Sequence, residues 1–152
     1  MSRVGIGYDS HRFEAGRPLI LGGVRIEHER GLVGHSDADV LTHAVIDALL
    51  GASGGGDIGT LFPDDDERWR DADSIDLLRT VVGTLGGRIV NIDATVVCEA
   101  PRLAPHRAEM ERVIAEATSA TVSVKATTNE GMGWIGRGEG IACIAVASLD
   151  SE

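Results

Sequence analysis

Residues 141–149 are apolar at nearly every position, and this run constrains the fold more than any other part of the chain. In a strand, successive side chains point to opposite faces of the sheet. Five residues of this run would face one side and four the other, and only Ser148 is polar. Both faces of such a strand should therefore be buried, as in a sheet that is covered on each side.

Other segments predict the rest of a mixed sheet. Alternation over residues 3–13 favours a strand with Gly5, Gly7, Asp9, His11 and Phe13 on one face and Val4, Ile6 and Tyr8 on the other. A short hairpin is expected over 19–26 around the Gly22-Gly23 pair. Two further strands are expected over 89–98 and 122–127.

The strongest helical pattern begins at Ser36. A Ser-x-x-Asp capping box there precedes apolar residues at helical spacing from Val40 to Leu49. Further helices are expected over 74–85, where Gly86-Gly87 would stop the helix, and over 105–117. Residues 51–70 are rich in glycine and acidic side chains without a period, which indicates a surface loop near a functional site.

These elements predict an α/β fold of the two-layer α+β type, in which three helices cover one face of a mixed four-stranded sheet. Three helices cannot cover both faces, so we expect partner subunits to cover the other face in a homo-oligomer. The length of 152 residues, without repeats or linkers, indicates one domain over 1–152.

The net charge of −10 argues against a nucleic-acid partner or an anionic membrane surface. No run approaches the roughly 20 apolar residues that cross a bilayer, and residues 1–12 lack the apolar core of a signal peptide. We therefore expect a cytoplasmic protein. Cys98 and Cys143 each lie in an apolar run, which is typical of reduced core residues.

The clearest candidate for a metal site combines Asp9, His11 and His43. Asp9 and His11 are two residues apart on one strand face, and His43 projects from the following helix. Two imidazoles and a carboxylate are a normal ligand set for catalytic zinc, with the fourth position open. The alternative is an ordinary hydrogen-bonded Asp9–His11 pair beside an uninvolved His43. Asp47, one helical turn after His43, could orient that ring or simply belong to a solvated helix face, which would show the same spacing.

Two further regions suit phosphate groups. His35 and Ser36 lie where free backbone N–H groups at a helix start favour an anion, although Ser36 could be only a cap. Gly54 to Gly59 lacks a P-loop ending and is interpreted as a flexible loop. The acidic run after Pro63 could contact substrate hydroxyl groups or be merely solvated.

Residues 125–140 form the other dense polar region. Their hydroxyl groups and glycine-rich backbone suit phosphate oxygens, and Glu130 offers a hard oxygen ligand for Mg²⁺. Arg137 could pair with an anion or only with Glu139. Their concentration in one loop between two expected core strands favours a functional role.

Six short motifs follow one another along nearly the whole chain: Y-D-S-H, G-H-S-D-A-D-V-x-x-H, G-D-I-G-x-L-F-P-D, A-P-R, K-A-T-T-x-E and G-R-G-E-G-I-A. One such motif alone would be weak, but six in this order are hard to obtain by accident. Together they resemble the 2-C-methyl-D-erythritol 2,4-cyclodiphosphate synthase family of the non-mevalonate isoprenoid pathway.

The resemblance implies a phosphorus-oxygen lyase. Such an enzyme converts 4-diphosphocytidyl-2-C-methyl-D-erythritol 2-phosphate to 2-C-methyl-D-erythritol 2,4-cyclodiphosphate and CMP. It also implies a homotrimer whose mixed sheets face the threefold axis and whose active sites lie between neighbours. The segment from Gly133 to Glu139 would then approach that axis, where a hydrophobic channel could hold an isoprenoid diphosphate.

The resemblance further implies specific site residues. Zinc would bind Asp9, His11 and His43, and Glu130 would hold Mg²⁺ or Mn²⁺ on the diphosphate of the substrate. Thr128 would act with these ligands in catalysis. Contacts to the cytidine and its phosphates would come from Ala100, Pro101, Arg102, Leu103, Thr127 and Thr128. Contacts to the methylerythritol phosphate would come from His35, Ser36, Asp57, Gly59 and Asp64, and Arg137 is a further candidate for substrate binding.

Two positions depart from the family pattern, since Arg102 stands where lysine is frequent and Asn129 where threonine or serine is expected. Two rival functions also fit the residues. One is a zinc phosphohydrolase that delivers metal-bound hydroxide to a phosphate ester. The other is a non-catalytic nucleotide-binding trimer in which zinc is only structural.

Overall fold

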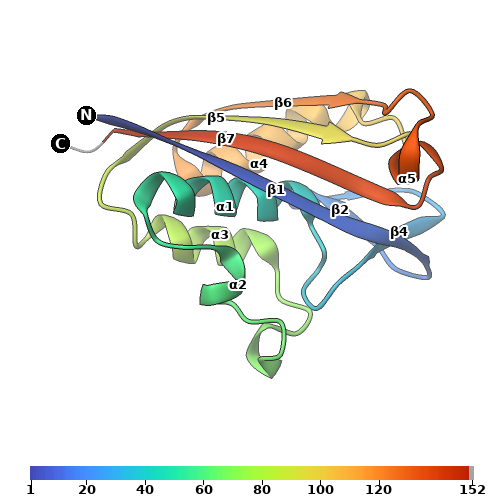
Figure 1. The fold of residues 1–152 in the computed structure, drawn as a ribbon, viewed down its shortest axis with the longest axis horizontal. Coiled ribbons are helices and arrows are strands. Elements are labelled where there is room, and N and C mark those ends of the chain that lie inside the picture. The colour runs from blue at the N-terminus through green and yellow to red at the C-terminus, as the bar shows by residue number, and fades with distance from the viewer. Residues whose placement is uncertain (151–152) are drawn as a thin grey trace.

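A five-stranded mixed sheet forms the upper layer of the molecule (Figure 1). The structure is a computed structural model and describes residues 1–150. Only the β5–β6 pair is parallel, and the other neighbours are antiparallel. In spatial order the strands are β4 (Arg30–Val33), β1 (Ser2–Ala15), β7 (Gly140–Asp150), β5 (Arg88–Val97) and β6 (Thr121–Thr127).

The sequence-based expectation of four strands was therefore wrong by one strand. The additional strand, β4, is only four residues long and contains a glycine, so it has too little alternation to be recognised. It pairs with the end of β1, from Arg12 opposite Val33 to Ala15 opposite Arg30. The expected hairpin is confirmed as β2 (Leu19–Leu21) and β3 (Val24–Ile26), which form a separate two-stranded sheet.

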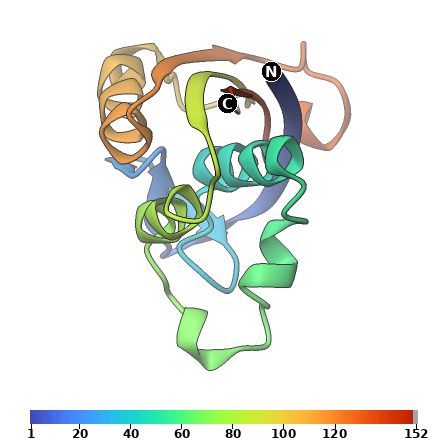
Figure 2. The same ribbon diagram turned by 90° about the vertical axis from the view of Figure 1, so that its left-hand side faces the viewer.

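Three longer helices lie on one face of the sheet, as Figures 1 and 2 show. They are α1 (Val40–Ser53), α3 (Ser74–Val82) and α4 (Arg107–Thr118). Residues 51–70, expected as a loop, contain the end of α1 and two short helical turns, too short to show a period. The short elements of the chain are α2 (Ile58–Leu61), the 3₁₀ turns η1 (Glu67–Trp69) and η2 (Ala104–His106), and α5 (Gly133–Gly136).

The capping box predicted at Ser36 is not formed, because α1 begins four residues later and Asp39 is its cap. The buried Asp39 carboxylate accepts four hydrogen bonds. Two come from Thr42, through its backbone N–H at 3.0 Å and its hydroxyl at 2.7 Å. Two come from the β2–β3 turn, through the backbone N–H groups of Gly22 at 2.9 Å and Gly23 at 2.8 Å. Tertiary contacts therefore decided where the helix begins.

The outer face of the sheet is apolar and uncovered in the single subunit. On β7 the helix-facing side chains are buried, whereas Ile144 and Val146 on the other face are 43% and 39% exposed. Val4, Ile6 and Tyr8 of the neighbouring β1 are also exposed. The expectation that both faces are buried thus holds for one face only within the subunit, and coverage of the other by partner subunits stays a prediction.

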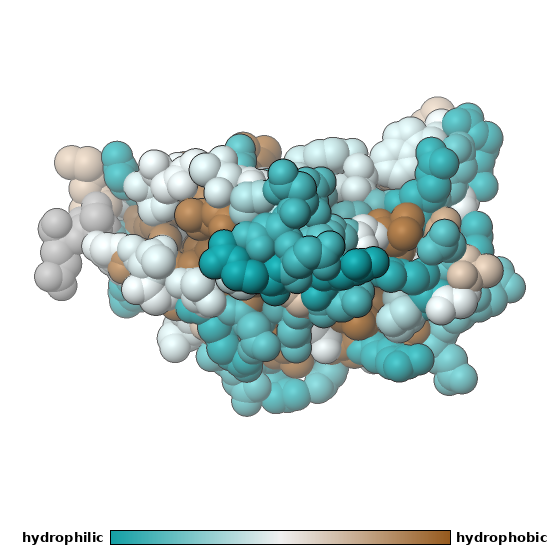
Figure 3. Space-filling view, turned by 90° about the horizontal axis from the view of Figure 1, so that it is seen from below, coloured by the Kyte–Doolittle hydropathy of each residue, from teal (hydrophilic) through white to brown (hydrophobic). Residues whose placement is uncertain are grey.

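The helical side of the molecule presents a different surface. Seen from below, it is covered largely by hydrophilic side chains, and hydrophobic ones show only in separate areas (Figure 3). Such a surface is normal for a face in contact with water. No helix among residues 1–150 is both long enough and apolar enough to span a membrane.

Candidate active site

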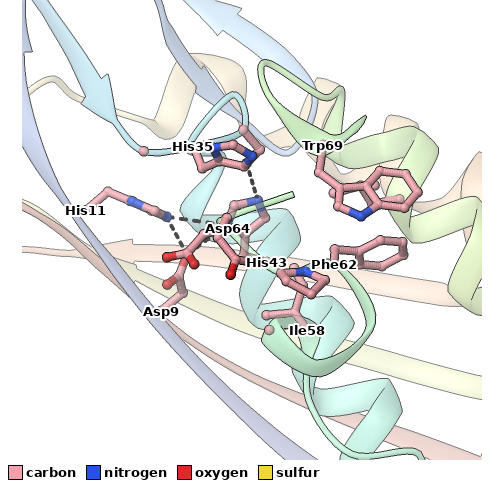
Figure 4. A pocket seen from close by; sticks show the side chains of 14 residues that line it. Asp9, His11, His35, His43, Ile58, Phe62, Asp64 and Trp69 are labelled. Atoms are coloured by element: carbon pink, nitrogen blue, oxygen red, sulfur yellow. Dashed lines mark hydrogen bonds and ion pairs between the residues drawn. The ribbon is translucent and has the colours of Figure 1, made fainter. Parts of the chain in front are cut away.

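Asp9, His11 and His43 meet at the contact between β1 and α1, and their side chains point toward one another (Figure 4). The Asp9 Oδ2 atom lies 2.8 Å from His11 Nε2 and 3.1 Å from His43 Nδ1. The two ring nitrogens are 3.3 Å apart. All three side chains are largely buried, with exposed fractions of 25%, 18% and 10% respectively.

This triangle suits a divalent metal. Ligand atoms about 2.0–2.2 Å from a tetrahedral zinc ion lie roughly 3.3–3.6 Å from one another, so the cluster needs to open only slightly. One carboxylate oxygen and two imidazole nitrogens also match the ligands that zinc prefers. The three residues fit the predicted zinc ligands in chemistry and in geometry.

The electrostatics of the cluster favour a cation. Burial acts to raise the pKa of Asp9, but hydrogen bonds and charge from His11 and His43 outweigh it, so the pKa of Asp9 is lowered. Burial acts to lower the pKa of His43, yet the hydrogen bond that the ring donates to Asp9 and the charges of Asp9, Asp39 and Asp37 raise it. The site thus holds an ionised carboxylate and attracts positive charge beside it.

The second nitrogen of each histidine is also engaged. The Nδ1 atom of His11 lies 3.0 Å from the carbonyl oxygen of Val33 on β4. The Nε2 atom of His43 lies 2.7 Å from the Ser74 hydroxyl oxygen and 3.1 Å from that of Ser36. Such contacts fix which nitrogen of a ligating histidine faces the metal.

The prediction that Asp47 orients the His43 ring was wrong. The Asp47 carboxylate instead accepts a hydrogen bond of 2.8 Å from the backbone N–H of Ile58, at the start of α2. Asp47 thus ties α1 to the loop that follows it. Helical spacing places Asp47 on the same helix face as His43. It could not show that the partner of His43 is Ser74, which belongs to α3.

A cavity of about 430 Å³ opens beside Asp9, His11 and His43, the three candidate ligands that we call the metal cluster. This volume is typical of small-molecule sites. Its polar lining includes four residues that the sequence predicted for the methylerythritol phosphate: His35, Ser36, Gly59 and Asp64. His35 is held by a 2.9 Å contact between its Nε2 atom and the Asp66 carbonyl oxygen. Asp57 does not line this cavity but caps α2, accepting two hydrogen bonds of 2.8 Å from Thr60.

The opposite wall of the cavity is apolar, which sequence analysis missed. Ile58, Phe62, Trp69 and Leu77 line it. The rings of Phe62 and Trp69 pack edge to face with centroids 4.9 Å apart, and Figure 4 shows them across from the metal cluster. Ile58 and Trp69 lie in the short elements α2 and η1, and Phe62 directly follows α2, so no apolar period marks them beforehand. Leu77 belongs to α3, whose apolar period indicates a buried helix face but not a cavity wall. A ligand with a hydrocarbon part beside its phosphates would suit such a wall.

A second, smaller cavity of about 190 Å³ lies at the end of β5 and β6. It is lined by five of the residues predicted for the nucleotide, namely Pro101, Arg102, Leu103, Thr127 and Thr128. Ala100 adjoins it through the cis Ala100–Pro101 peptide bond. The two cavities share no lining residue, so within one subunit the structure does not join the predicted nucleotide residues to the metal cluster.

The loop that carries Glu130 is fastened to the end of β5. The Glu99 carboxylate accepts hydrogen bonds from the backbone N–H groups of Asn129 at 2.7 Å and Gly131 at 2.8 Å. Glu130 itself is exposed and has a left-handed backbone with a φ of 54°. Glu99 was missed because its role is to hold backbone groups 30 residues and more away along the chain.

Arg137 forms an ion pair with Glu139 in this structure. Its Nε and Nη2 atoms each lie 2.8 Å from Glu139 Oε2. Both residues are exposed, so the pair leaves the guanidinium accessible. Of the two alternatives that the sequence left open, the structure displays the pairing with Glu139.

The two cysteines contribute no thiolate to either cavity. Burial, together with the charge of Glu99, raises the pKa of Cys98 to about 11. Burial also raises the pKa of Cys143. Both residues are free and buried, which confirms the expectation of reduced core cysteines.

A mixed α/β fold, with a carboxylate and two imidazoles that could hold a metal at the edge of a cavity of small-molecule size, fits the class of metal-dependent enzymes of phosphate chemistry. Within this class, the chain belongs to the YgbB family, which it matches over residues 2–150. The predicted family membership is therefore confirmed.

Named relatives agree along almost the full length. The chain is 57% identical to the 2-C-methyl-D-erythritol 2,4-cyclodiphosphate synthase of Salinibacter ruber, covering 98% of this chain and 99% of the relative. A solved structure of 2C-methyl-D-erythritol-2,4-cyclodiphosphate synthase in its CDP-bound form is 37% identical. It superimposes with a TM-score of 0.88 over 97% of this chain and 100% of that one.

The bifunctional IspDF structure from Campylobacter jejuni is also similar, with a TM-score of 0.95 and 40% identity. The match covers 100% of this chain but only 43% of that protein. This chain therefore corresponds to a portion of the bifunctional protein and to the whole length of the stand-alone synthases.

Proposed function

We propose that this chain converts 4-diphosphocytidyl-2-C-methyl-D-erythritol 2-phosphate to 2-C-methyl-D-erythritol 2,4-cyclodiphosphate and CMP. The observation that carries the proposal is the cluster of Asp9, His11 and His43 at the edge of a cavity that also contains His35 and Ser36. The full-length similarity to synthases of this name supports the same reaction.

The proposed metals are zinc at the three-residue cluster and Mg²⁺ or Mn²⁺ held by Glu130. When bound, such ions withdraw charge from phosphoryl oxygens and stabilise the charge that develops during displacement at phosphorus. Asp9, His11 and His43 would hold the zinc ion, which could then take one further ligand such as a phosphate oxygen. The exposure of the Glu130 side chain agrees with a metal that is shared with the substrate.

In the proposed reaction the substrate supplies its own nucleophile. An oxygen of its 2-phosphate forms a bond to the β-phosphorus, the bond from that phosphorus to the bridging oxygen breaks, and CMP leaves with the electron pair. The sequence pattern indicated no serine paired with a histidine as a nucleophile, but the structure brings the Ser74 and Ser36 hydroxyl groups to 2.7 and 3.1 Å from His43 Nε2. The proposed reaction needs neither of them as a covalent nucleophile, and the Ser74 hydroxyl is already bonded to Asp37. The task of the protein is then to fold the substrate, and such positioning can contribute about 7–11 kcal/mol in favourable cases.

Specific side chains suit this positioning task. Ser36 lies beside the metal cluster and can donate a hydrogen bond to a phosphate oxygen, His35 lines the same cavity, and Asp64 is available for a substrate hydroxyl. The apolar wall formed by Phe62 and Trp69 can pack against the methylerythritol carbons and exclude water. We assign Pro101, Arg102, Leu103, Thr127 and Thr128 to the cytidine and its phosphates, with Ala100 beside them and Arg137 as a further substrate contact.

We further propose a homotrimer of one-domain subunits, each spanning 1–152, in the cytoplasm. Two observations support the trimer. The outer faces of β1 and β7 carry exposed apolar residues, including Ile6 at 70% exposure. The nucleotide cavity and the metal cluster are separate in one subunit. A neighbouring subunit is therefore needed to place a nucleotide cavity beside a metal cluster in one active site. An isoprenoid diphosphate near the threefold axis, close to Gly133–Glu139, belongs to the same proposal.

One incubation separates the proposal from its two rivals. The protein is mixed with the cytidine substrate, zinc and magnesium, and the products are separated by chromatography. Release of CMP together with a cyclic diphosphate supports the synthase. Release of inorganic phosphate indicates the phosphohydrolase, and binding without turnover indicates the non-catalytic nucleotide-binding protein.

A further inference from the structure

The ring of His43 is held on the side away from the metal cluster by a chain of buried polar groups. Its Nε2 atom lies 2.7 Å from the hydroxyl oxygen of Ser74, the first residue of α3. Ser74 is completely buried, and its hydroxyl also makes a short hydrogen bond to the Asp37 carboxylate. These hydrogen bonds form a relay from His43 through Ser74 to Asp37.

The direction of each hydrogen bond follows from a count of hydrogens. The Asp37 carboxylate already accepts two backbone N–H groups, from Ser74 at 2.9 Å and from Asp39 at 3.1 Å. An ionised carboxylate only accepts, so the single hydroxyl hydrogen of Ser74 must point to Asp37. The Ser74 oxygen is then left to accept from His43, which requires a hydrogen on Nε2.

A hydrogen on Nε2 of a neutral imidazole leaves the lone pair on Nδ1. Nδ1 is the nitrogen within the metal cluster, 3.1 Å from Asp9 Oδ2 and 3.3 Å from His11 Nε2. In the protonated ring Nδ1 donates its hydrogen to Asp9, and this is the hydrogen that a metal ion would replace, because the hydrogen on Nε2 stays with Ser74. We infer that Ser74 and Asp37 are positioning residues that set the His43 tautomer required for metal binding through Nδ1. This inference rests on the proposed zinc site and deepens it.

Ser36 fits the same scheme. Its hydroxyl oxygen lies 3.1 Å from the same Nε2 atom and 3.4 Å from the backbone nitrogen of Ala38. The one hydrogen on Nε2 goes mainly to Ser74, which is closer, and a protonated Nε2 has no lone pair to which Ser36 could donate. Ser36 accepts from Ala38 and keeps its own hydrogen for a group in the cavity. The relay thus also leaves Ser36 able to donate to a phosphate oxygen.

Two substitutions disturb the relay in different ways. Asp37→Asn keeps the volume but replaces one acceptor atom by an amide that donates to Ser74, so the hydroxyl hydrogen turns toward His43 Nε2 and favours the wrong tautomer. Ser74→Ala removes the acceptor. Loss of an outer partner of a metal-ligating histidine typically lowers metal affinity about 10–100-fold. We expect a loss in that range for Asp37→Asn and for Ser74→Ala.

The control is Asp73→Ala, which removes the side chain that caps α3 at Ile75 N without removing a contact to His43. It should lower the melting temperature while the zinc dissociation constant stays within about twofold of the parent value. If Ser74 and Asp37 served only to begin α3, all three variants would instead lose stability and keep their zinc affinity.

The experiment measures zinc affinity by competition with a chromophoric chelator, without substrate, and records the His43 tautomer by ¹⁵N NMR of the metal-free protein at alkaline pH. The inference predicts a hydrogen on Nε2 in the parent chain, a shift toward Nδ1 in Asp37→Asn, and weaker zinc binding in both relay variants. Unchanged affinity in both variants, or a hydrogen on Nδ1 in the parent chain, would overturn it. A parent chain that takes up no zinc would refute the zinc site, and the metal-free tautomer would still decide the relay.

Discussion

Gly7 of β1 lies so close to α1 that a Cβ atom placed on it would sit 1.9 Å from the carbonyl oxygen of Ala44. Only a glycine allows the strand and the helix to approach in this way. Asp9 follows Gly7 by two residues on the same strand face, and His43 directly precedes Ala44 on the helix. The close approach of two backbones therefore sets the distance between two of the three metal ligands.

The first prediction is that Gly7→Ala destabilises the fold and weakens the metal site together. The added methyl group would force α1 away from β1, at a cost of about 3 kcal/mol in the free energy of unfolding. Urea unfolding would measure this loss, and zinc competition would measure the site. Gly86→Ala is the matched control, since a Cβ there meets no atom within 4 Å. Equal stability of Gly7→Ala and Gly86→Ala would show that the contact does not constrain the fold.

The second prediction concerns Asp39, whose two oxygens accept four hydrogen bonds from Thr42, Gly22 and Gly23. Asp39→Asn turns one acceptor atom into a donor that faces two other donors in a buried site. We expect a loss of about 3 kcal/mol in the free energy of unfolding. Asp76→Asn, an exposed change on α3, should cost about 0.5 kcal/mol or less. Denaturant midpoints of both variants at neutral pH decide the comparison, and a similar small loss in both would contradict it.

The third prediction is one zinc ion per subunit, bound through Asp9, His11 and His43. His43→Ala leaves two protein ligands, so zinc affinity should fall by more than the roughly 10–100-fold expected for loss of an outer partner. Elemental analysis after gel filtration gives the metal content. His28→Ala is the control, because His28 packs on Phe13 outside the cluster and should retain the full zinc content. A His43→Ala protein with undiminished zinc would rule out the assignment.

The fourth prediction is the trimer. Ile6 is 70% exposed in the subunit, on the outer apolar face of the sheet. Light scattering on a size-exclusion column should give a molar mass three times that of one chain. The Ile6→Asp variant should give a mass closer to that of a single chain. Thr80→Asp, an exposed change on the helical side, should leave the trimer intact. A parent chain that is monomeric and active would refute the shared site.

Periodicity explains which parts of the fold could be predicted. The last strand, β1 and the core of α1 each have a long, regular apolar pattern, and their positions were predicted. Elements of four residues, β4 and α2, have no such pattern. The start of α1 was misplaced because the turn between β2 and β3 favours Asp39 over Ser36 as the cap. That turn is distant in the sequence, so rules based on neighbouring residues could not predict its effect.

The candidate site was predictable to the extent that it depends on one strand. Asp9 and His11 share a face because strand side chains repeat every two residues, and their meeting with His43 followed from the next helix. The partner of His43 could not be found in this way, since Ser74 is 31 residues further along the chain. Helical spacing suggested Asp47 instead, and packing of α3 against α1 decided the matter.

Phosphorus NMR of the reaction products tests the central claim most directly. The parent protein, zinc and magnesium are incubated with 4-diphosphocytidyl-2-C-methyl-D-erythritol 2-phosphate until the substrate is consumed. Intramolecular attack by the 2-phosphate predicts two mutually coupled signals of a cyclic diphosphate and an equimolar amount of CMP. Inorganic phosphate with linear phosphate esters would contradict cyclisation and assign the chain to phosphate hydrolysis.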